Sequence, residues 1–232
     1  MIMNNIAIIP ARGGSKRIPR KNIRPFLGRP IISYSIEAAL EAQCFDEIMV
    51  STDDPEIAEI ARKFGAIVPF MRSPENASDI AGTAEALIEV YNTYLTLGKQ
   101  FSHLCCIYPT APFITPTKLR NGMEILHSSG ADCVLPIVSY SYPIQRALKL
   151  ESGQVVMIWP DNYPKRSQDL APSYHDCGQF YCMSAKSLLQ QKKLFADHTV
   201  PMLMPETEVQ DIDTLQDWEL AEIKYLRLQP LV

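Results

Sequence analysis

A loop near the N-terminus combines five cations with two adjacent glycines. It follows Pro10 and contains Gly13 and Gly14 among Arg12, Lys16, Arg17, Arg20 and Lys21. Glycine lets backbone amides approach a ligand closely. A bound anion would offset the positive charge of five neighbouring cations. Neither GxxxxGK[ST] nor GxGxxG is present, so this is neither of the two common phosphate fingerprints. We expect a phosphate-binding loop, and the alternative is a solvated basic turn.

Two carboxylates separated by one residue lie near the other end of the chain. On an extended segment, Asp211 and Asp213 point to the same side and can reach one site. Magnesium binds oxygen ligands, keeps several waters and bridges to substrate phosphates, so two protein carboxylates are enough. The pair predicts a Mg²⁺ site. Taken alone, a solvated turn with a helix N-cap would be the better interpretation, and the basic loop elsewhere in the chain favours the metal.

Strand and helix patterns alternate along the chain and must position these side chains. Strands are predicted at about 6–9, 47–51, 66–70, 104–108, 132–138 and 178–183, and helices at about 31–39, 55–63, 84–97, 116–127, 186–194 and 218–228. This alternation is typical of an α/β fold, a Rossmann-like three-layer sandwich whose mostly parallel sheet carries helices on both faces. Ligands of such sheets bind at the carboxyl ends of the strands, where the basic loop lies.

Residues 139–173 break the alternation. Prolines, aromatic residues and polar residues crowd together there, with a predicted hairpin around Gly153. We interpret residues 1–232 as one domain from which this segment projects as a small inserted subdomain. Because so much apolar surface outside the main sheet needs covering, we expect the segment to reach a second copy in a homodimer.

Composition limits the classes of protein that this chain can belong to. It has 232 residues, 47% of them hydrophobic, and a net charge of −4, which disfavours a nucleic-acid partner. No apolar run is long enough to span a bilayer, and the N-terminus has no signal-peptide pattern, so we expect no membrane association and a cytoplasmic location. The six cysteines are dispersed without a CxxC pair, which indicates reduced thiols, and the adjacent Cys105 and Cys106 are expected to face opposite sides of a strand.

Five segments resemble those of one enzyme family. IIPARGGSKRIPRKN resembles the N-terminal signature of the CMP-sialic acid synthetases, which are sugar nucleotidyltransferases. The same resemblance is carried, in the right order, by VSTDD at 50–54, RSPENASD at 72–79, YPTAPF at 108–113 and DIDTLQDW at 211–218. It covers nearly the whole chain and implies the nucleotide-diphospho-sugar transferase type of fold.

The resemblance implies a CTP site and a metal site. Arg12 and Lys21 would hold the triphosphate, Asn22 would read cytosine, and Asp211 and Asp213 would hold Mg²⁺ as part of the catalytic set. The implied nucleotide-binding residues are Ala11, Arg12, Gly13, Gly14, Ser15, Lys21, Asn22, Arg72, Asp79 and Thr110. For Asp79 a helix-capping role is an open alternative.

The sugar-binding positions depart from the sialic acid pattern. HDCGQFY stands where those enzymes have NGAIY or NGSFY, and YPT replaces QPT. Both departures resemble the pseudaminic acid cytidylyltransferases, which activate a nine-carbon (nonulosonic) acidic sugar. The implied substrate-binding residues are Tyr108, Arg166, Gln168, Gln179 and Tyr181, and the Arg166 guanidinium could pair with the sugar carboxylate through two hydrogen bonds.

The implied reaction is attack of a sugar hydroxyl on the α-phosphorus of CTP with release of pyrophosphate. It needs no protein nucleophile, because positioning and charge stabilisation by Arg12, Lys21 and Mg²⁺ suffice. Within the superfamily, a cytidylyltransferase for legionaminic, sialic or octulosonic acid is an alternative. From other classes, a non-catalytic nucleotide-sugar-binding protein would lack the two aspartates, and a glycosyltransferase would carry Asp-x-Asp in mid-chain without the basic loop.

Overall fold

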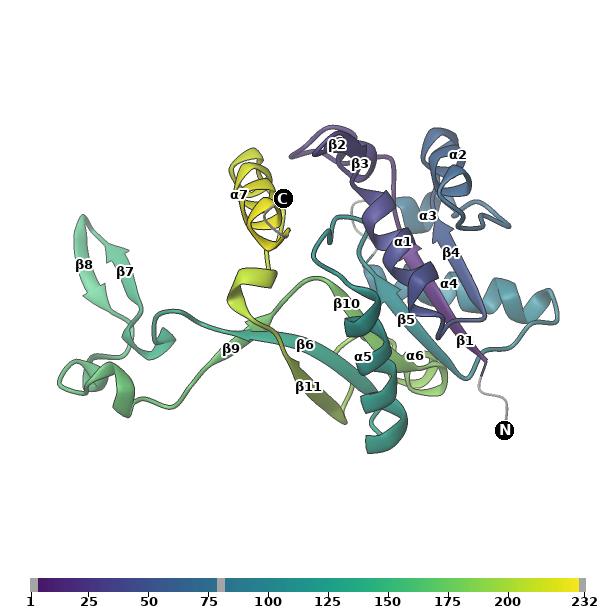
Figure 1. The fold of residues 1–232 in the computed structure, drawn as a ribbon. Coiled ribbons are helices and arrows are strands. Elements are labelled where there is room, and N and C mark those ends of the chain that lie inside the picture. Colours follow the sequence, from purple (N-terminus) through teal and green to yellow (C-terminus); the bar gives the residue numbers. More distant parts are fainter. Residues whose placement is uncertain (1–3, 79–81, 230–232) are drawn as a thin grey trace.

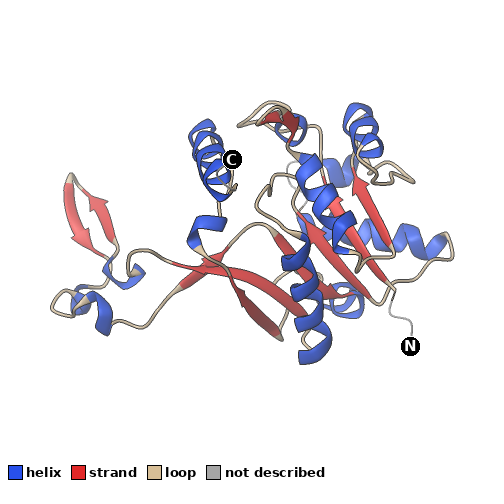
Figure 2. Cartoon of the chain, in the orientation of Figure 1, coloured by secondary structure: helices blue, strands red, loops and turns tan. Residues whose placement is uncertain are grey.

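A mixed seven-stranded sheet runs through the molecule in the computed structural model, which describes residues 4–78 and 82–229 (Figure 1, Figure 2). The strand order is β11-β6-β10-β5-β1-β4, with β9 paired to β6. Strand β1 is parallel to β4 and β5, and β6 is parallel to β11, whereas β10 runs antiparallel to both β5 and β6. The bounds are β1 Asn5–Pro10, β4 Glu47–Ser51, β5 His103–Ile107, β6 Cys133–Ser139, β9 Tyr174–Asp176, β10 Phe180–Ser184 and β11 Thr199–Leu203.

The strands consist of consecutive apolar residues because helices cover both faces of the sheet and bury the side chains on each face. Ile6 and Ile8 of β1 pack on one face, and Ala7 and Ile9 pack on the other. Each such isoleucine, fully withdrawn from water, contributes about 2 kcal/mol to folding. The expectation that Cys105 and Cys106 face opposite sides of their strand is confirmed, since they belong to the two different apolar clusters.

Five helices form the outer layers of the sandwich. The face that carries Ala7 is covered by α1 (Ile32–Ala42), α2 (Pro55–Lys63) and α5 (Pro116–Ser129). The opposite face is covered by α4 (Thr83–Thr96) and α6 (Ala185–Gln191). The predicted three-layer α/β sandwich with a mostly parallel sheet is therefore confirmed.

The last helix, α7 (Leu215–Leu228), lies apart from these layers and fixes the segment before it. Its Trp218 packs edge-on against Phe26, 5.7 Å between ring centroids, next to the short hairpin of β2 (Pro25–Phe26) and β3 (Arg29–Pro30). The helix begins with a capping box, in which Thr214 and Asp217 each accept a hydrogen bond from the other's backbone amide. Asp211 and Asp213 are thus held at the start of a well-fixed helix.

Two parts of the predicted element order differ from the structure. The strand predicted at 66–70 is wrong: only Ile67 pairs with β4, as an isolated parallel bridge to Met49 with hydrogen bonds to Ile48 and Val50, and the pairing does not extend into a ladder. The strands β2, β3, β9 and β11 and the short helix α3 (Pro74–Ala77) were not predicted. Strand β11 contains Pro201 and is half-exposed, which fits an edge strand and gives little periodic signal.

Residues 139–173, here called the arm, leave the sheet after β6 and return through β9. The predicted hairpin is confirmed as β7 (Leu148–Glu151) and β8 (Gln154–Met157), and it projects well away from the sheet (Figure 1). Tyr142, Leu150 and Tyr163 of the arm are 72–85% exposed. Among the described residues, no helix has the length and apolar character needed to cross a membrane.

Candidate functional site

A cavity of about 620 Å³ opens at the carboxyl ends of β1 and β5. The loop after β1, the turn after β5 and the segment before α7 form its walls. Eight residues predicted to bind nucleotide, sugar or metal line it together: Arg12, Ser15, Lys21, Asn22, Tyr108, Thr110, Asp211 and Asp213. Lys16 and Arg17 of the predicted phosphate-binding loop also line it, together with Thr83 and Gly178, for which the sequence predicted no role.

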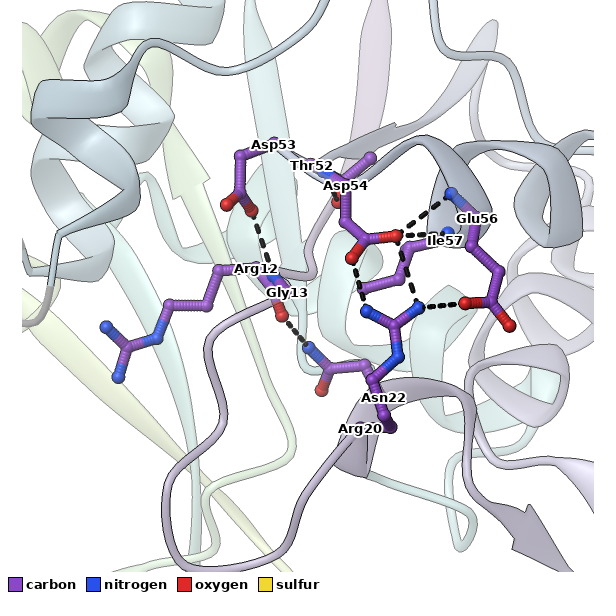
Figure 3. Close-up of polar contacts among 9 residues, drawn as sticks. All are labelled: Arg12, Gly13, Arg20, Asn22, Thr52, Asp53, Asp54, Glu56 and Ile57. Carbon is purple, nitrogen blue, oxygen red and sulfur yellow. Dashed lines mark hydrogen bonds and ion pairs between the residues drawn. The ribbon is translucent and has the colours of Figure 1, made fainter.

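The loop after β1 is closed by its own hydrogen bonds. The amide of Ala11 donates to the carbonyl oxygen of Ser51 at the end of β4, at 2.9 Å. Asn22, whose side chain is buried, donates from Nδ2 to the carbonyl oxygen of Arg12 at 2.8 Å (Figure 3). Asn22 therefore links the two ends of the loop. This structural role is additional to its predicted role, which is to recognise cytosine.

Two aspartates after β4 hold the loop from outside the cavity (Figure 3). The Gly13 amide donates to Oδ1 of Asp53 at 2.9 Å, and the Arg20 guanidinium pairs with Asp54. Asp54 is also the N-cap of α2, directly before the helix that the sequence predicts from about residue 55. The contacts of both aspartates with the loop were not predicted, because pairings across some 40 residues leave no local pattern in a single sequence.

The basic loop and the aspartate pair meet inside the cavity. Nζ of Lys21 lies 3.5 Å from Oδ1 of Asp213 and donates to the carbonyl oxygen of Ile212. Nη2 of Arg17 lies 2.6 Å from the same carboxylate oxygen. The two segments that the sequence singled out are thus neighbours in space, at opposite ends of the chain.

The two carboxylates are suited to a divalent cation. Burial and the negative charge of Asp213 raise the pKa of Asp211. Both effects disfavour two ionised carboxylates side by side, and a bound cation would stabilise that ionised form. In the described part of the chain no group of three or more His, Cys, Asp or Glu side chains could hold a metal ion. Magnesium commonly takes one or two protein carboxylates and completes its shell with water and phosphate, so the Asp211 and Asp213 pair fits it.

Arg72 lies behind the main cavity. It lines a smaller cavity of about 220 Å³ together with Arg12 and Tyr108. Its guanidinium is buried and donates to the side chain and the carbonyl oxygen of Ser51, at 3.0 and 2.6 Å, and burial lowers its pKa. The prediction that Arg72 contacts the nucleotide stays untested, and Asp79 lies outside the described residues.

The residues predicted to bind the sugar fall into two groups. Tyr108 lines the main cavity and packs edge-on against Tyr181, at 5.6 Å between ring centroids. Tyr181 is buried, which raises its pKa, and its hydroxyl donates to Asp176 at 2.7 Å. Gln179 is buried beside it, and its Nε2 donates to the carbonyl oxygen of Glu208 at 2.8 Å. Neither Gln179 nor Tyr181 lines the cavity, and Tyr181 supports its wall through the contact with Tyr108.

Arg166 and Gln168 form the second group and lie on the arm. The Arg166 guanidinium pairs with Asp169 of the arm at 2.8 Å, and neither Arg166 nor Gln168 lines the cavity of its own chain. Arg166 and Gln168 could therefore contact a bound sugar only if the arm extends to the cavity of another copy of the chain.

Comparisons with known proteins show the family of the chain. A sequence model of the family described as cytidylyltransferase matches residues 6–141. The chain is 43% identical over 224 residues to the pseudaminic acid cytidylyltransferase of Campylobacter jejuni subsp. jejuni serotype O:23/36 (strain 81-176), covering 96% of this chain and 97% of the relative. It is 34% identical over 228 residues to the CMP-N,N'-diacetyllegionaminic acid synthase of Legionella pneumophila subsp. pneumophila (strain Philadelphia 1), covering 95% of each.

A solved structure has the same fold. It is a CMP:2-keto-3-deoxy-manno-octonic acid synthetase complexed with CTP, which superposes with a TM-score of 0.69 at 18% identity and covers 98% of this chain and all of that one.

Proposed function

The chain belongs to the cytidylyltransferase family and is a nucleotidyltransferase, and on that premise we propose that it transfers CMP from CTP to a nine-carbon acidic keto-sugar, pseudaminic acid. The C2 hydroxyl of the sugar attacks the α-phosphorus of CTP. The bond from that phosphorus to the bridging oxygen breaks, pyrophosphate leaves, and the hydroxyl proton is lost. The products are the CMP-sugar and pyrophosphate.

The observation that carries this proposal is the meeting of the basic loop with the aspartate pair in one cavity. A nucleotide-binding protein without catalytic activity needs only the loop. A protein that breaks a bond at the α-phosphorus also needs charge stabilisation there, which the aspartates can provide by holding a divalent cation.

Each residue of the cavity has a task in the proposed reaction. Arg12 and Lys21 hold the triphosphate and offset its charge, and Gly14 gives phosphate oxygens open access to the backbone, since no atom lies within 4 Å of where its Cβ would be. Asn22 faces the cytosine while it closes the loop. Mg²⁺, when bound by Asp211 and Asp213, would supply further charge stabilisation to the phosphates.

The sugar is assigned from the cavity wall and from the relatives. Tyr108, backed by Tyr181, gives the wall an aromatic surface, which suits a sugar with few hydroxyls and two acylated amines. The relative from Campylobacter that carries the pseudaminic acid name is 43% identical, whereas the legionaminic acid synthase is 34% identical. We therefore favour pseudaminic acid and keep legionaminic acid as the alternative.

A homodimer completes the proposal, with the reaction taking place in the cytoplasm. The exposed apolar side chains of the arm need a partner surface, and a second copy is the partner we propose. In that arrangement Arg166 would approach the cavity of the other chain and pair with the sugar carboxylate.

The test is a pyrophosphate-release assay with CTP, Mg²⁺ and a panel of nonulosonic acids. We expect pseudaminic acid to give the highest kcat/KM. A clear preference for legionaminic or sialic acid would reassign the sugar, and no release with any member of the panel would contradict the proposed function.

A further inference from the structure

Arg20 precedes Lys21 in the loop but turns away from the cavity. Its guanidinium lies against the turn between β4 and α2, where it donates to both carboxylate oxygens of Asp54 and to Glu56 (Figure 3). The Asp54 side chain is only 17% exposed, so this pair is better shielded than an ordinary surface ion pair. A two-pronged contact between guanidinium and carboxylate fixes direction as well as distance.

Asp54 is itself rigidly held. Its Oδ1 accepts hydrogen bonds from the amides of Glu56 and Ile57 at 2.9 and 3.0 Å, which makes it the N-cap of α2. Its own amide donates to Oγ1 of Thr52 at 3.1 Å. The hydrogen bond from Arg20 lowers the pKa of Asp54, so the carboxylate stays ionised. Arg20 is therefore tied to a fixed point of the scaffold.

The backbone at Arg20 shows why a tie is needed. Arg20 has φ of 56° and ψ of 29°, in the left-handed region that residues other than glycine rarely adopt. Directly after it the chain forms the short 3₁₀ helix Lys21–Ile23, which directs Lys21 into the cavity and Asn22 onto Arg12. An unfavourable backbone conformation of this kind persists only when surrounding contacts hold it.

Asp54 also contacts the other branch of the loop. A Cβ at Gly13 would lie 2.8 Å from Oδ2 of Asp54, so only glycine fits against the carboxylate there. The Asp54 side chain thus lies close to the loop at Gly13 and pairs with it at Arg20.

We propose that Arg20 and Asp54 are positioning residues, a clamp that holds Lys21, Asn22 and the Gly13 backbone in the nucleotide-binding arrangement before the nucleotide arrives. The proposal rests on the proposed function for the identity of the ligand, CTP. Neither residue touches substrate, and both act through the loop.

The test compares Arg20→Ala, Asp54→Asn and the double variant in the full-length protein. Asp54→Asn keeps an oxygen for the α2 cap, because asparagine is also a good N-cap, but it turns an amide toward the guanidinium. Because misplacing a binding loop by about 1 Å costs up to about 100-fold, we expect the Kd and the KM for CTP to rise about 10-fold to 100-fold. The KM for the sugar should not change.

The double variant shows whether Arg20 and Asp54 affect CTP binding as one pair or independently of each other. If Arg20 acts through Asp54, the double variant should bind CTP no more weakly than Arg20→Ala alone. Multiplied losses would show that the residues act independently and would overturn the proposal. A fall in the fraction of active protein with unchanged KM for CTP would show a merely structural role and would overturn it as well.

Hydrogen exchange of the unliganded protein provides a readout that does not need substrate. Residues 13–23 should exchange faster in Arg20→Ala than in the wild type, while β1 and β5 keep their protection. Lys193→Ala is the matched control, because it breaks the exposed pair with Asp197, 2.5 Å apart, outside the cavity. Unchanged exchange in the loop would contradict the clamp. A wild-type protein that fails to bind CTP would instead contradict the proposed function, and the exchange data would still test the clamp.

Discussion

Nζ of Lys21 lies 3.5 Å from a carboxylate oxygen of Asp213, which brings the first loop of the chain against the segment before its last helix. Neither residue has the other as a local neighbour in sequence. A separate apolar cluster brings them together, because Ile18 of the first loop packs in it with Ile212 and with Trp218 of α7. A cation-rich loop and a pair of carboxylates in contact are what a metal-assisted reaction of a nucleotide requires.

Replacing Asp213 by asparagine should abolish synthesis without unfolding the protein. A neutral amide is a poor Mg²⁺ ligand, so we expect kcat to fall by about 100-fold or more. The side chain is 36% exposed, so the free energy of unfolding should change by no more than about 1 kcal/mol. Pyrophosphate release at saturating Mg²⁺ and urea unfolding measure the two effects.

Two further variants, a second aspartate of the pair and a control outside the cavity, are measured in the same way. Asp211→Asn should behave similarly, whereas Asp197→Asn, which changes an exposed carboxylate paired with Lys193, should keep wild-type activity. Near-normal release by a folded Asp213→Asn protein would show that this pair is not the metal site.

The two adjacent glycines of the loop should respond differently to alanine. At Gly13 a Cβ would lie 2.8 Å from Asp54, whereas at Gly14 nothing lies within 4 Å of the same atom. We expect Gly13→Ala to lower the free energy of unfolding by about 1–3 kcal/mol and Gly14→Ala to change it by about 0.5 kcal/mol or less. Chemical denaturation of both variants without nucleotide is the measurement, and equal stability would contradict the described packing of Gly13.

Much of the layout could be predicted from the sequence because its signals are local. Ile6–Ile9 has the apolar run of a buried strand. Helix α5 has Thr115 as its N-cap and Pro116 as its first residue, and it is followed by Gly130, which has the positive φ of a helix C-cap. The aspartate pair stood out because two carboxylates one residue apart share a side. These features depend only on nearby residues, so periodicity and capping rules are enough to identify them.

The rest depends on contacts between distant segments. The pairing of Arg20 with Asp54, the burial of Arg72 against Ser51 and the hydrogen bond from Tyr181 to Asp176 have no local pattern. Residues 66–70 were predicted as a strand because they form a short apolar run. Such a run does not show whether the segment will form a full ladder of hydrogen bonds with a neighbouring strand. Arg166 was assigned to the sugar from its motif, and its distance from the cavity became apparent only with the path of the arm.

The arm should hold two copies of the chain together. Light scattering at micromolar concentration should give twice the chain mass of 26.1 kDa. Leu150→Asp, at a position 82% exposed on the arm, should shift the mass toward that of one chain, because a buried unpaired carboxylate opposes association. Leu97→Asp, at a position 61% exposed just after α4, should leave the mass unchanged. A monomeric wild type would contradict the proposed dimer.

A pair of histidines should make stability fall below neutral pH. The rings of His103 and His127 lie 4.6 Å apart, and burial lowers the pKa of both from the ordinary value of 6.5. The unfolded chain therefore takes up protons at a higher pH than the folded chain does. Their contribution to the free energy of unfolding is fully present well above pH 6.5 and is lost progressively as the pH falls through and below it.

Urea unfolding between about pH 7.5 and pH 5.5 tests this linkage. The double variant His103→Gln, His127→Gln should lose stability less steeply over that range than the wild type. If both proteins show the same slope, the two histidines are not the groups responsible.

Identifying the product formed from each nucleoside triphosphate tests the proposed CMP transfer. Purified protein is incubated with Mg²⁺, pseudaminic acid and either CTP, ATP or GTP, and the mixture is analysed by mass spectrometry alongside released pyrophosphate. We predict a CMP-sugar in one-to-one ratio with pyrophosphate from CTP, and no corresponding product from ATP or GTP, because in the proposed function Asn22 and Arg72 would bind a pyrimidine and exclude a purine. Comparable products from ATP, or pyrophosphate without any CMP-sugar, would contradict the proposed reaction.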